Sequence, residues 1–126
     1  MIQVCLDGES EDEDLVLIIK RLAQANRMNI HDRSKQSNRE LTNLGQHPGY
    51  RIVNISASRP DGLGVAVGNL GLSEKEFAIG ITQGSDREET DRLTRALEDA
   101  IPTNWNPQNV PAGQGAKSSS TCTANE

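Results

Sequence analysis

Aromatic side chains are scarce in this 126-residue chain and make up only 2% of it. Trp105, Tyr50 and Phe77 are the single representatives of their types. A hydrophobic core would therefore have to be built from Leu, Ile, Val and Ala. The length suits one domain of ordinary size and is short for two. We expect a single domain with a lean aliphatic core.

Long apolar runs and an excess of basic residues are also missing. No stretch approaches the about 18 consecutive apolar residues of a membrane span, and Met1 leads directly into a strand-like run rather than a signal segment. We therefore expect a cytoplasmic protein with no membrane partner.

The formal charge is −5, whereas nucleic-acid binders gain most of their non-specific affinity from Lys and Arg. This charge argues against a nucleic-acid partner.

Cysteine occurs only twice, at Cys5 and Cys122. The two residues lack the close spacing of metal ligands, and one lies in a strand-like run while the other lies in a Ser/Thr-rich segment. Disulfides are rare in the cytoplasm. We therefore expect no disulfide between them, and we expect no cofactor.

The opening of the chain predicts a strand followed by a helix. Residues 2–6 alternate apolar and polar side chains, which is typical of a strand with one face on a core. Ser10 and Glu13 have the spacing of a capping box, which favours a helix start. The apolar face of this helix would comprise Leu15, Ile18, Ile19 and Leu22, with Ala25 extending it.

The middle of the chain predicts a hairpin and a further strand. Apolar residues alternate with polar ones over residues 53–58 and return at Val65 and Val67. Between these runs lies Pro60-Asp61-Gly62, in which proline presets φ and glycine accepts a positive φ. Residues 77–82 alternate in the same way and predict another strand.

A second helix is predicted after residue 84. Ser85 and Glu88 again have capping-box spacing, and Pro102 ends the helical pattern. The predicted apolar stripe comprises Leu93, Ala96, Leu97, Ala100 and Ile101. Beyond it, Trp105 is placed to fold back onto the domain.

Two segments give weak signals for regular structure. Residues 29–50 carry little periodicity and contain a Gly/Pro turn cluster, so we expect a loop with at most one short strand or helical turn. Residues 108–126 are rich in Gly, Ser and Thr and offer little apolar surface. We expect a domain over residues 1–107 and a flexible, dispensable tail over residues 108–126.

These elements predict an α+β fold. The expected architecture is a two-layer sandwich, in which a mainly antiparallel sheet of about four strands carries two helices on one face.

The acidic turn after the first strand, Asp7-Gly8 with Glu11 and Asp12, resembles the first strand-turn-helix of Toprim-type metal-dependent domains. The resemblance covers about the first 22 residues and implies that Asp7, Glu11 and Asp12 would hold a metal ion, although that family has glutamate where this chain has Asp7. Toprim chemistry also needs an acidic pair at the end of a later strand, to surround Mg²⁺ with oxygen ligands. The later candidates, Asp61 and Asp86, each stand alone. We therefore favour a capped helix whose acidic residues complement its dipole, with no metal.

Basic residues concentrate between residues 27 and 59, in contrast to the acidic segments 7–14 and 86–99. If they gather in space, they form a patch suited to a phosphate, a nucleotide or an acidic protein surface. The alternative is a solvated loop. The candidate binding residues are Arg27, Arg33, Lys35, Arg39, Arg51 and Arg59.

No catalytic constellation emerges from the sequence, so we expect a protein that is not an enzyme. The leading hypothesis is a small acidic binding module that acts on a protein partner, as an inhibitor, an immunity protein or a regulatory subunit does. A lean core also favours a homodimer or other homo-oligomer. The alternative is a small-molecule or nucleotide-phosphate binder, or a metal-dependent phosphodiesterase with a degenerate Toprim-like turn. A small-molecule binder would need a concave pocket that joins carboxylates to arginines.

Overall fold

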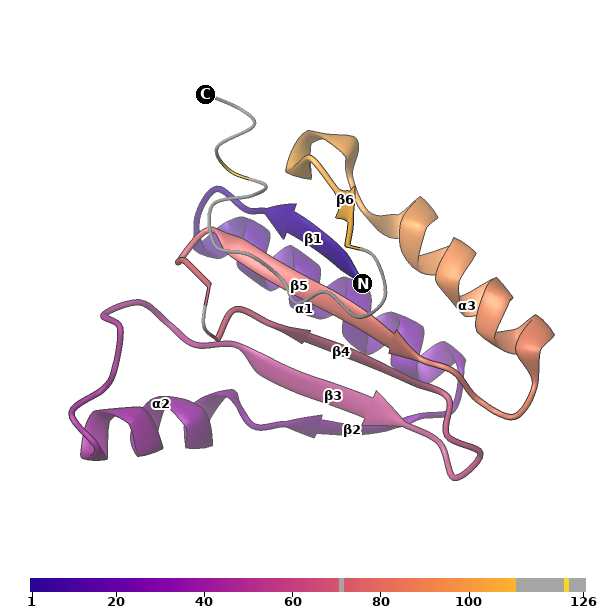
Figure 1. Ribbon diagram of the computed structural model, residues 1–126, viewed down its shortest axis with the longest axis horizontal. Coiled ribbons are helices and arrows are strands. Elements are labelled where there is room, and N and C mark those ends of the chain that lie inside the picture. The colour runs from indigo at the N-terminus through magenta and orange to yellow at the C-terminus, as the bar shows by residue number, and fades with distance from the viewer. Residues whose placement is uncertain (71, 111–121, 123–126) are drawn as a thin grey trace.

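The structure, a computed structural model, describes residues 1–70, 72–110 and 122 (Figure 1). The elements in chain order are β1 (Ile2–Cys5), α1 (Glu9–Ala25), β2 (Asn29–Asp32), α2 (Ser34–Asn43), β3 (Asn54–Ser58), β4 (Gly64–Gly68), β5 (Glu76–Thr82), α3 (Arg87–Ala100), the 3-10 helix η1 (Thr103–Trp105) and β6 (Gln108–Asn109). In the described part of the chain, no helix is both long enough and apolar enough to cross a membrane.

The strands form one antiparallel sheet in the order β2-β3-β4-β5-β1-β6. The expected α+β class and antiparallel sheet are confirmed. The expected element numbers are too low, because the described residues form six strands and three α-helices. The predicted hairpin is β3 and β4, joined through Pro60-Asp61-Gly62.

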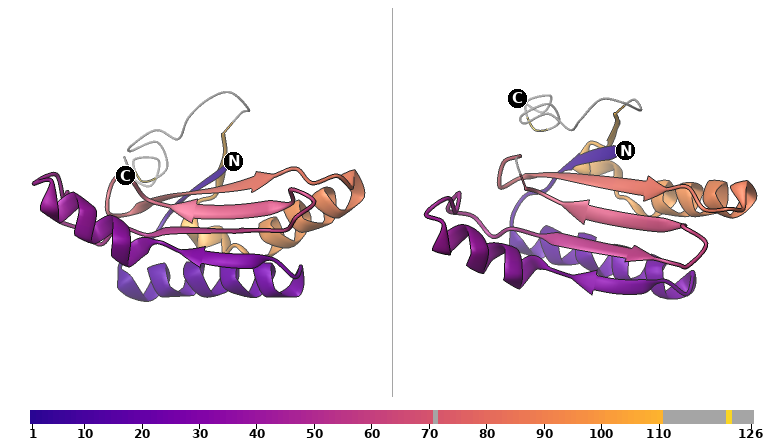
Figure 2. Two further views of the ribbon diagram at one scale, coloured as in Figure 1. Left: turned by 90° about the horizontal axis from the view of Figure 1, so that it is seen from below. Right: turned by 60° about the horizontal axis from the view of Figure 1, so that its bottom comes forward.

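The helices α1 and α3 pack beside each other on one face of the sheet, so that the molecule has two layers (Figure 2). The side chains that alternate toward this face form the core, because a strand turns every second residue to the same side. Val4, Ile55 and Phe77 are among them and are fully buried. The helices contribute Leu15, Ile19, Leu93, Leu97 and Ile101. Ala25, Ala96 and Ala100, which we expected on the apolar faces, are exposed.

Both predicted capping boxes are wrong. Helix α1 begins after Gly8, whose φ is 111°, and the Glu11 carboxylate accepts a hydrogen bond from the backbone N–H of Asp7 at 2.6 Å. Helix α3 begins after Asp86, whose side chain accepts hydrogen bonds from the N–H groups of Glu88 and Glu89. At α3 the Asp86 carboxylate thus meets free N–H groups of the first turn, whereas at α1 no side chain of the described residues does so. Neither Ser10 nor Ser85 acts as the cap.

Residues 29–50 are more regular than the expected loop, because they contain β2 and α2. Strand β2 gains its hydrogen bonds from β3, which lies more than twenty residues away in sequence. Only Ile30 of this edge strand packs on the core. A strand with a single inward apolar residue leaves almost no alternation in the sequence, which explains why the local pattern did not predict it.

The C-terminal segment returns to β1. Strand β6 pairs with Ile2 and Gln3, and the N–H of Val110 donates to the carbonyl of Met1 at 2.8 Å. The expected start of the tail, residue 108, is thus the first residue of β6. Most of that tail, residues 111–121 and 123–126, lies outside the described residues.

The expectation that Cys5 and Cys122 do not form a disulfide is wrong. Their sulfur atoms are bonded and their Cα atoms are 5.2 Å apart, across a sequence separation of 117 residues. The expectation rested on cellular compartment and sequence distance. Neither the compartment nor the sequence distance indicates that the fold places Cys122 next to β1.

Candidate functional site

Four of the six predicted binding residues gather at one end of the sheet. Three of them, Arg33, Lys35 and Arg39, are exposed on or next to α2, and Arg51 is exposed shortly before β3. In the β2–β3 pair, Asp32 lies opposite Ile55, so the chain leaves β2 and enters β3 at the same end. We call residues 33–51 the α2 lobe. It lies beyond the end of the sheet rather than beneath it (Figure 2).

The other two predicted residues, Arg27 and Arg59, lie at the opposite end of the sheet. They flank the pair formed by Asn29 and Ser58, at the far end of the same two strands. The six residues are therefore divided between the two ends of the β2–β3 ladder.

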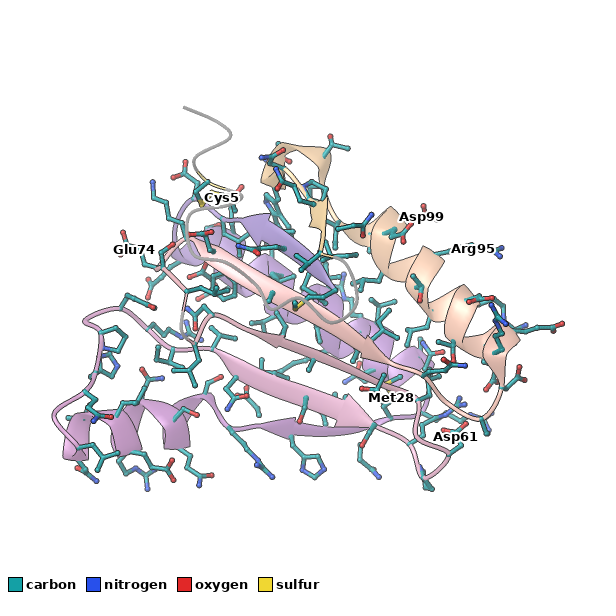
Figure 3. All side chains as sticks on the ribbon, in the orientation of Figure 1. Cys5, Met28, Asp61, Glu74, Arg95 and Asp99 are labelled. Carbon is teal, nitrogen blue, oxygen red and sulfur yellow. A yellow bond between two sulfur atoms is a disulfide. The ribbon has the colours of Figure 1, made fainter. Side chains whose placement is uncertain are left out.

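Arg59 forms two ion pairs within the fold. Its guanidinium contacts the carboxylates of Asp61 and Glu89, which ties the β3–β4 turn to α3, and Figure 3 shows Asp61 close to the start of that helix. The hydrogen bond from Arg59 holds the pKa of Asp61 below its usual range, and the two carboxylates raise the pKa of Arg59. Arg59 therefore stabilises a turn rather than offering its charge to a partner.

Asn38 fixes the shape of the α2 lobe. Its side-chain N–H groups donate to the carbonyls of Ser34 and Ile52 at 2.7 and 2.9 Å, and its oxygen accepts from the N–H of Ile52 at 3.0 Å. The same oxygen lies 2.8 Å from Nε2 of His47, whose Nδ1 accepts a hydrogen bond from the N–H of Gly49. One amide thus joins the helix to the loop that follows it. Our sequence reasoning missed this residue, since asparagine inside a helix carries only a weak local signal.

The basic residues on or next to α2 have no partner of opposite charge in the described part of the chain. Among the described residues, no salt bridge involves Arg33, Lys35 or Arg39. The lobe contains four basic residues and a single carboxylate, Glu40, which is hydrogen-bonded to Gln36. It therefore carries a positive charge on a chain whose formal charge is −5.

A cleft of about 320 Å³ opens at the N-terminus of α1. We call it the acidic cleft, and it is lined by Asp7, Gly8, Glu9, Asp12, Gly49, Tyr50, Arg51, Glu74 and Lys75. It joins part of the acidic turn to one of the predicted arginines, Arg51. Four carboxylates face two cations here, so a phosphate would meet more repulsion than attraction.

The residues expected to hold a metal in the Toprim-like reading do not form a ligand set. Glu11 uses both carboxylate oxygens, because one accepts from the N–H of Asp7 and the other from Nε1 of Trp105 at 3.1 Å. Asp7 faces Lys75 at 3.8 Å. Within the described ranges, no three His, Cys, Asp or Glu side chains are placed to hold a metal ion. The later carboxylates are engaged as well, since Asp61 pairs with Arg59 and Asp86 caps α3.

Asp12 is the most perturbed carboxylate in the acidic cleft. Its pKa is raised to about 6, mainly by burial; Arg51 opposes the shift, and the charges of Glu9, Glu11 and Glu13 act in the same direction as burial. In the part of the chain that is described, its Oδ1 atom is buried without a hydrogen-bond partner. The N-terminus of a helix ordinarily favours a negative charge, but here the loss of solvation outweighs that effect.

We predict that Asp12→Asn stabilises the protein at neutral pH. Because folding raises the pKa of Asp12, the folded state binds the proton more tightly, and stability is lost as the pH rises from the unfolded value of 3.8 through about 6. The variant removes this loss, so its advantage over the wild type should be full at pH 7 and should vanish below about pH 4. Urea midpoints across this range would measure it. An advantage independent of pH would contradict the assignment.

The comparisons with known proteins add no assignment to this geometry, because no protein-family model, curated protein or solved structure matches the chain.

Proposed function

We propose that this protein is a non-catalytic binding module that engages the acidic surface of a protein partner through the α2 lobe. The observation that carries the proposal is the set of exposed cations on or next to α2, namely Arg33, Lys35 and Arg39, which form no salt bridge with any described residue. Asn38 and its hydrogen bonds hold the lobe in one shape. A preorganised basic surface loses little conformational freedom when it binds.

Charge segregation supports an electrostatic mode of recognition. The α2 lobe is positive while the remainder of the chain is strongly negative, so an approaching acidic surface would be attracted to one end of the molecule and repelled elsewhere. Complementary potentials of this kind raise association rates and fix orientation more than they raise affinity. Such behaviour suits an inhibitor, an immunity protein or a regulatory subunit.

The alternative of a small-molecule or nucleotide binder depends on the acidic cleft. That cleft contains Arg51 and Lys75 but none of the α2 cations. Its excess of carboxylates disfavours phosphate groups. We therefore rank a nucleotide ligand below a protein partner, and the proposed function needs no cofactor.

We predict that Arg33→Glu combined with Arg39→Glu abolishes binding to an immobilised polyglutamate, which serves as the probe for an acidic protein surface. The wild-type protein should be retained at low salt and released as salt rises, because surface charges are screened over about 10 Å at 0.1 M salt. The double variant should flow through. Its urea midpoint should change little, since exposed substitutions usually cost within about 0.5 kcal/mol.

The matched control is Arg92→Glu combined with Arg95→Glu on α3. These two arginines are exposed, Arg95 points away from the sheet (Figure 3), and neither enters a salt bridge within the described residues. The control carries the same change in formal charge, so it should retain binding if position matters. Equal loss in both variants would show that only net charge counts and would overturn the proposal.

A second copy of the chain is also a candidate partner. Helix α3 exposes Asp91, Glu98 and Asp99, which could face the α2 lobe of another molecule. Self-association of this kind should weaken with salt, and sedimentation of the wild type and the α2 double variant would detect it.

The compartment that we propose is the cytoplasm, in line with the sequence-based expectation. Cytoplasmic thiol systems keep most cysteines reduced. The bond between Cys5 and Cys122 would then be a transient one.

A further inference from the structure

Strand β2 is the outermost strand at one side of the sheet (Figure 1). It pairs with β3 on its inner side, and no strand of the described residues pairs with it on its outer side. Asn29, His31 and Asp32 are exposed, and Ile30 is half-buried. An edge strand of this kind presents N–H and C=O groups with which another chain can pair.

The backbone groups of Ile30 and Asp32 point away from β3. In an antiparallel pair, successive residues turn their N–H and C=O groups alternately toward the neighbouring strand and away from it. The N–H of Arg33 donates to the carbonyl of Asn54 at 2.8 Å, so the backbone of Arg33 faces β3. Ile30 and Asp32 lie at odd separations from Arg33 and therefore face outward. Each of them offers one donor and one acceptor to an added strand.

Cations flank this outer edge at both ends. Arg27 lies just before β2 and Arg33 directly after it. Both are exposed, and neither forms a salt bridge with a described residue. The one carboxylate of the strand, Asp32, is already engaged, because Lys20 of α1 lies 3.4 Å from one oxygen and the N–H of Ser34 donates to the other. The edge therefore favours an acidic partner.

The same cations argue against a second copy of this chain at the edge. If two β2 strands paired symmetrically about Ile30, Arg27 of each copy would approach Arg33 of the other. If they paired about His31, Arg27 would approach Lys35. Like charges opposite each other destabilise an antiparallel pair, whereas an acidic strand would meet attraction at these positions.

We infer that the outer edge of β2 binds an extended acidic segment of a protein partner, which joins the sheet as a further strand. The backbone groups of Ile30 and Asp32 hold the segment through main-chain hydrogen bonds, and Arg27 and Arg33 meet its carboxylates. The acidity of the partner rests on the proposed function, with which this edge shares Arg33. The pairing with β2 is an additional mode of recognition.

The opposite edge of the sheet, formed by β6, lacks these features. Strand β6 has two residues, and residues 101–110 include no Lys or Arg. An acidic segment should therefore select β2, and β6 serves as an internal control.

Amide hydrogen exchange followed by NMR would test the pairing, with an end-blocked peptide of alternating glutamate and valine as the probe. Binding should slow exchange at the N–H groups of Ile30 and Asp32 by about tenfold or more, because these donors move from water into a strand ladder. Exchange in β6 should stay unchanged. The same peptide N-methylated at every residue keeps its charge and loses its main-chain donors, so it should bind about tenfold more weakly or worse.

Arg27→Glu tests the edge from the side of the protein, because Arg27 lies outside the α2 lobe. This variant should bind the peptide about fivefold more weakly, as expected for the loss of an exposed ion pair. Arg92→Glu is the matched control, since it makes the same change of charge at an exposed position of α3 and should bind the peptide as the wild type does. Equal weakening in both variants would overturn the inference.

Retention on polyglutamate separates a failure of this inference from a failure of the proposed function. If the wild type is retained but the peptide leaves exchange at Ile30 and Asp32 unchanged, the pairing is wrong and the proposed function stands. Equal binding of the two peptides has the same meaning. Slow exchange at these amides without peptide, increasing with protein concentration, would assign the edge to a second copy and contradict the inference. A wild-type protein that is not retained would overturn both.

Discussion

Trp105→Ala is expected to lower the free energy of unfolding by about 3–5 kcal/mol, the usual cost of emptying a large buried aromatic site. Trp105 is only 2% exposed although it lies beyond α3, in the 3-10 helix η1. Its indole packs into the core, and its N–H donates to Glu11 of α1 at 3.1 Å. The variant therefore removes both apolar burial and a link between the C-terminal segment and the first helix. The urea midpoint, followed by circular dichroism, would measure the loss.

Trp105→Phe separates the two contributions. Phenylalanine keeps much of the apolar volume and loses the N–H group, so its cost should approach the about 1.5–3 kcal/mol of a hydrogen bond to a charged group. The acceptor of this hydrogen bond, the Glu11 carboxylate, is partly exposed, so water can replace the lost N–H group. We therefore expect a cost at the lower end of this range. A change of less than about 0.5 kcal/mol for Trp105→Ala would mean that the tryptophan does not anchor the segment.

Leu97→Ala should cost about 2–5 kcal/mol, as for other fully buried leucines. Leu97 is 1% exposed and belongs, with Leu93 and Ile101, to the stripe through which α3 joins the core. The core is close-packed, so its neighbouring side chains can fill only part of the cavity that the substitution leaves. The same denaturant measurement applies.

Leu17→Ala is the matched control for this substitution. Leu17 also lies inside a helix, α1, but is 46% exposed, so the same chemical change should cost little. Equal losses in the two variants would indicate that helix propensity, rather than burial in the core, sets the effect at Leu97.

The sequence by itself determined the elements whose signals are local. The hairpin of β3 and β4 was predictable because apolar alternation and Pro60-Asp61-Gly62 act within a few residues of each other. The core faces of α1 and α3 followed from helical periodicity, apart from the exposed alanines. The burial of Trp105 was predictable as well, because a large aromatic side chain near a helix end rarely stays in water.

Only the tertiary structure decided the features that depend on distant partners. Strand β2 exists because β3 pairs with it, and Asn38 matters because Ile52 and His47 come within its reach. The six predicted cations divided between two ends of the sheet, which no count of charges could reveal. Cys5 met Cys122 across almost the whole chain. In each case the deciding contact joins residues far apart in sequence, and local patterns carry no information about such contacts until the sheet order is known.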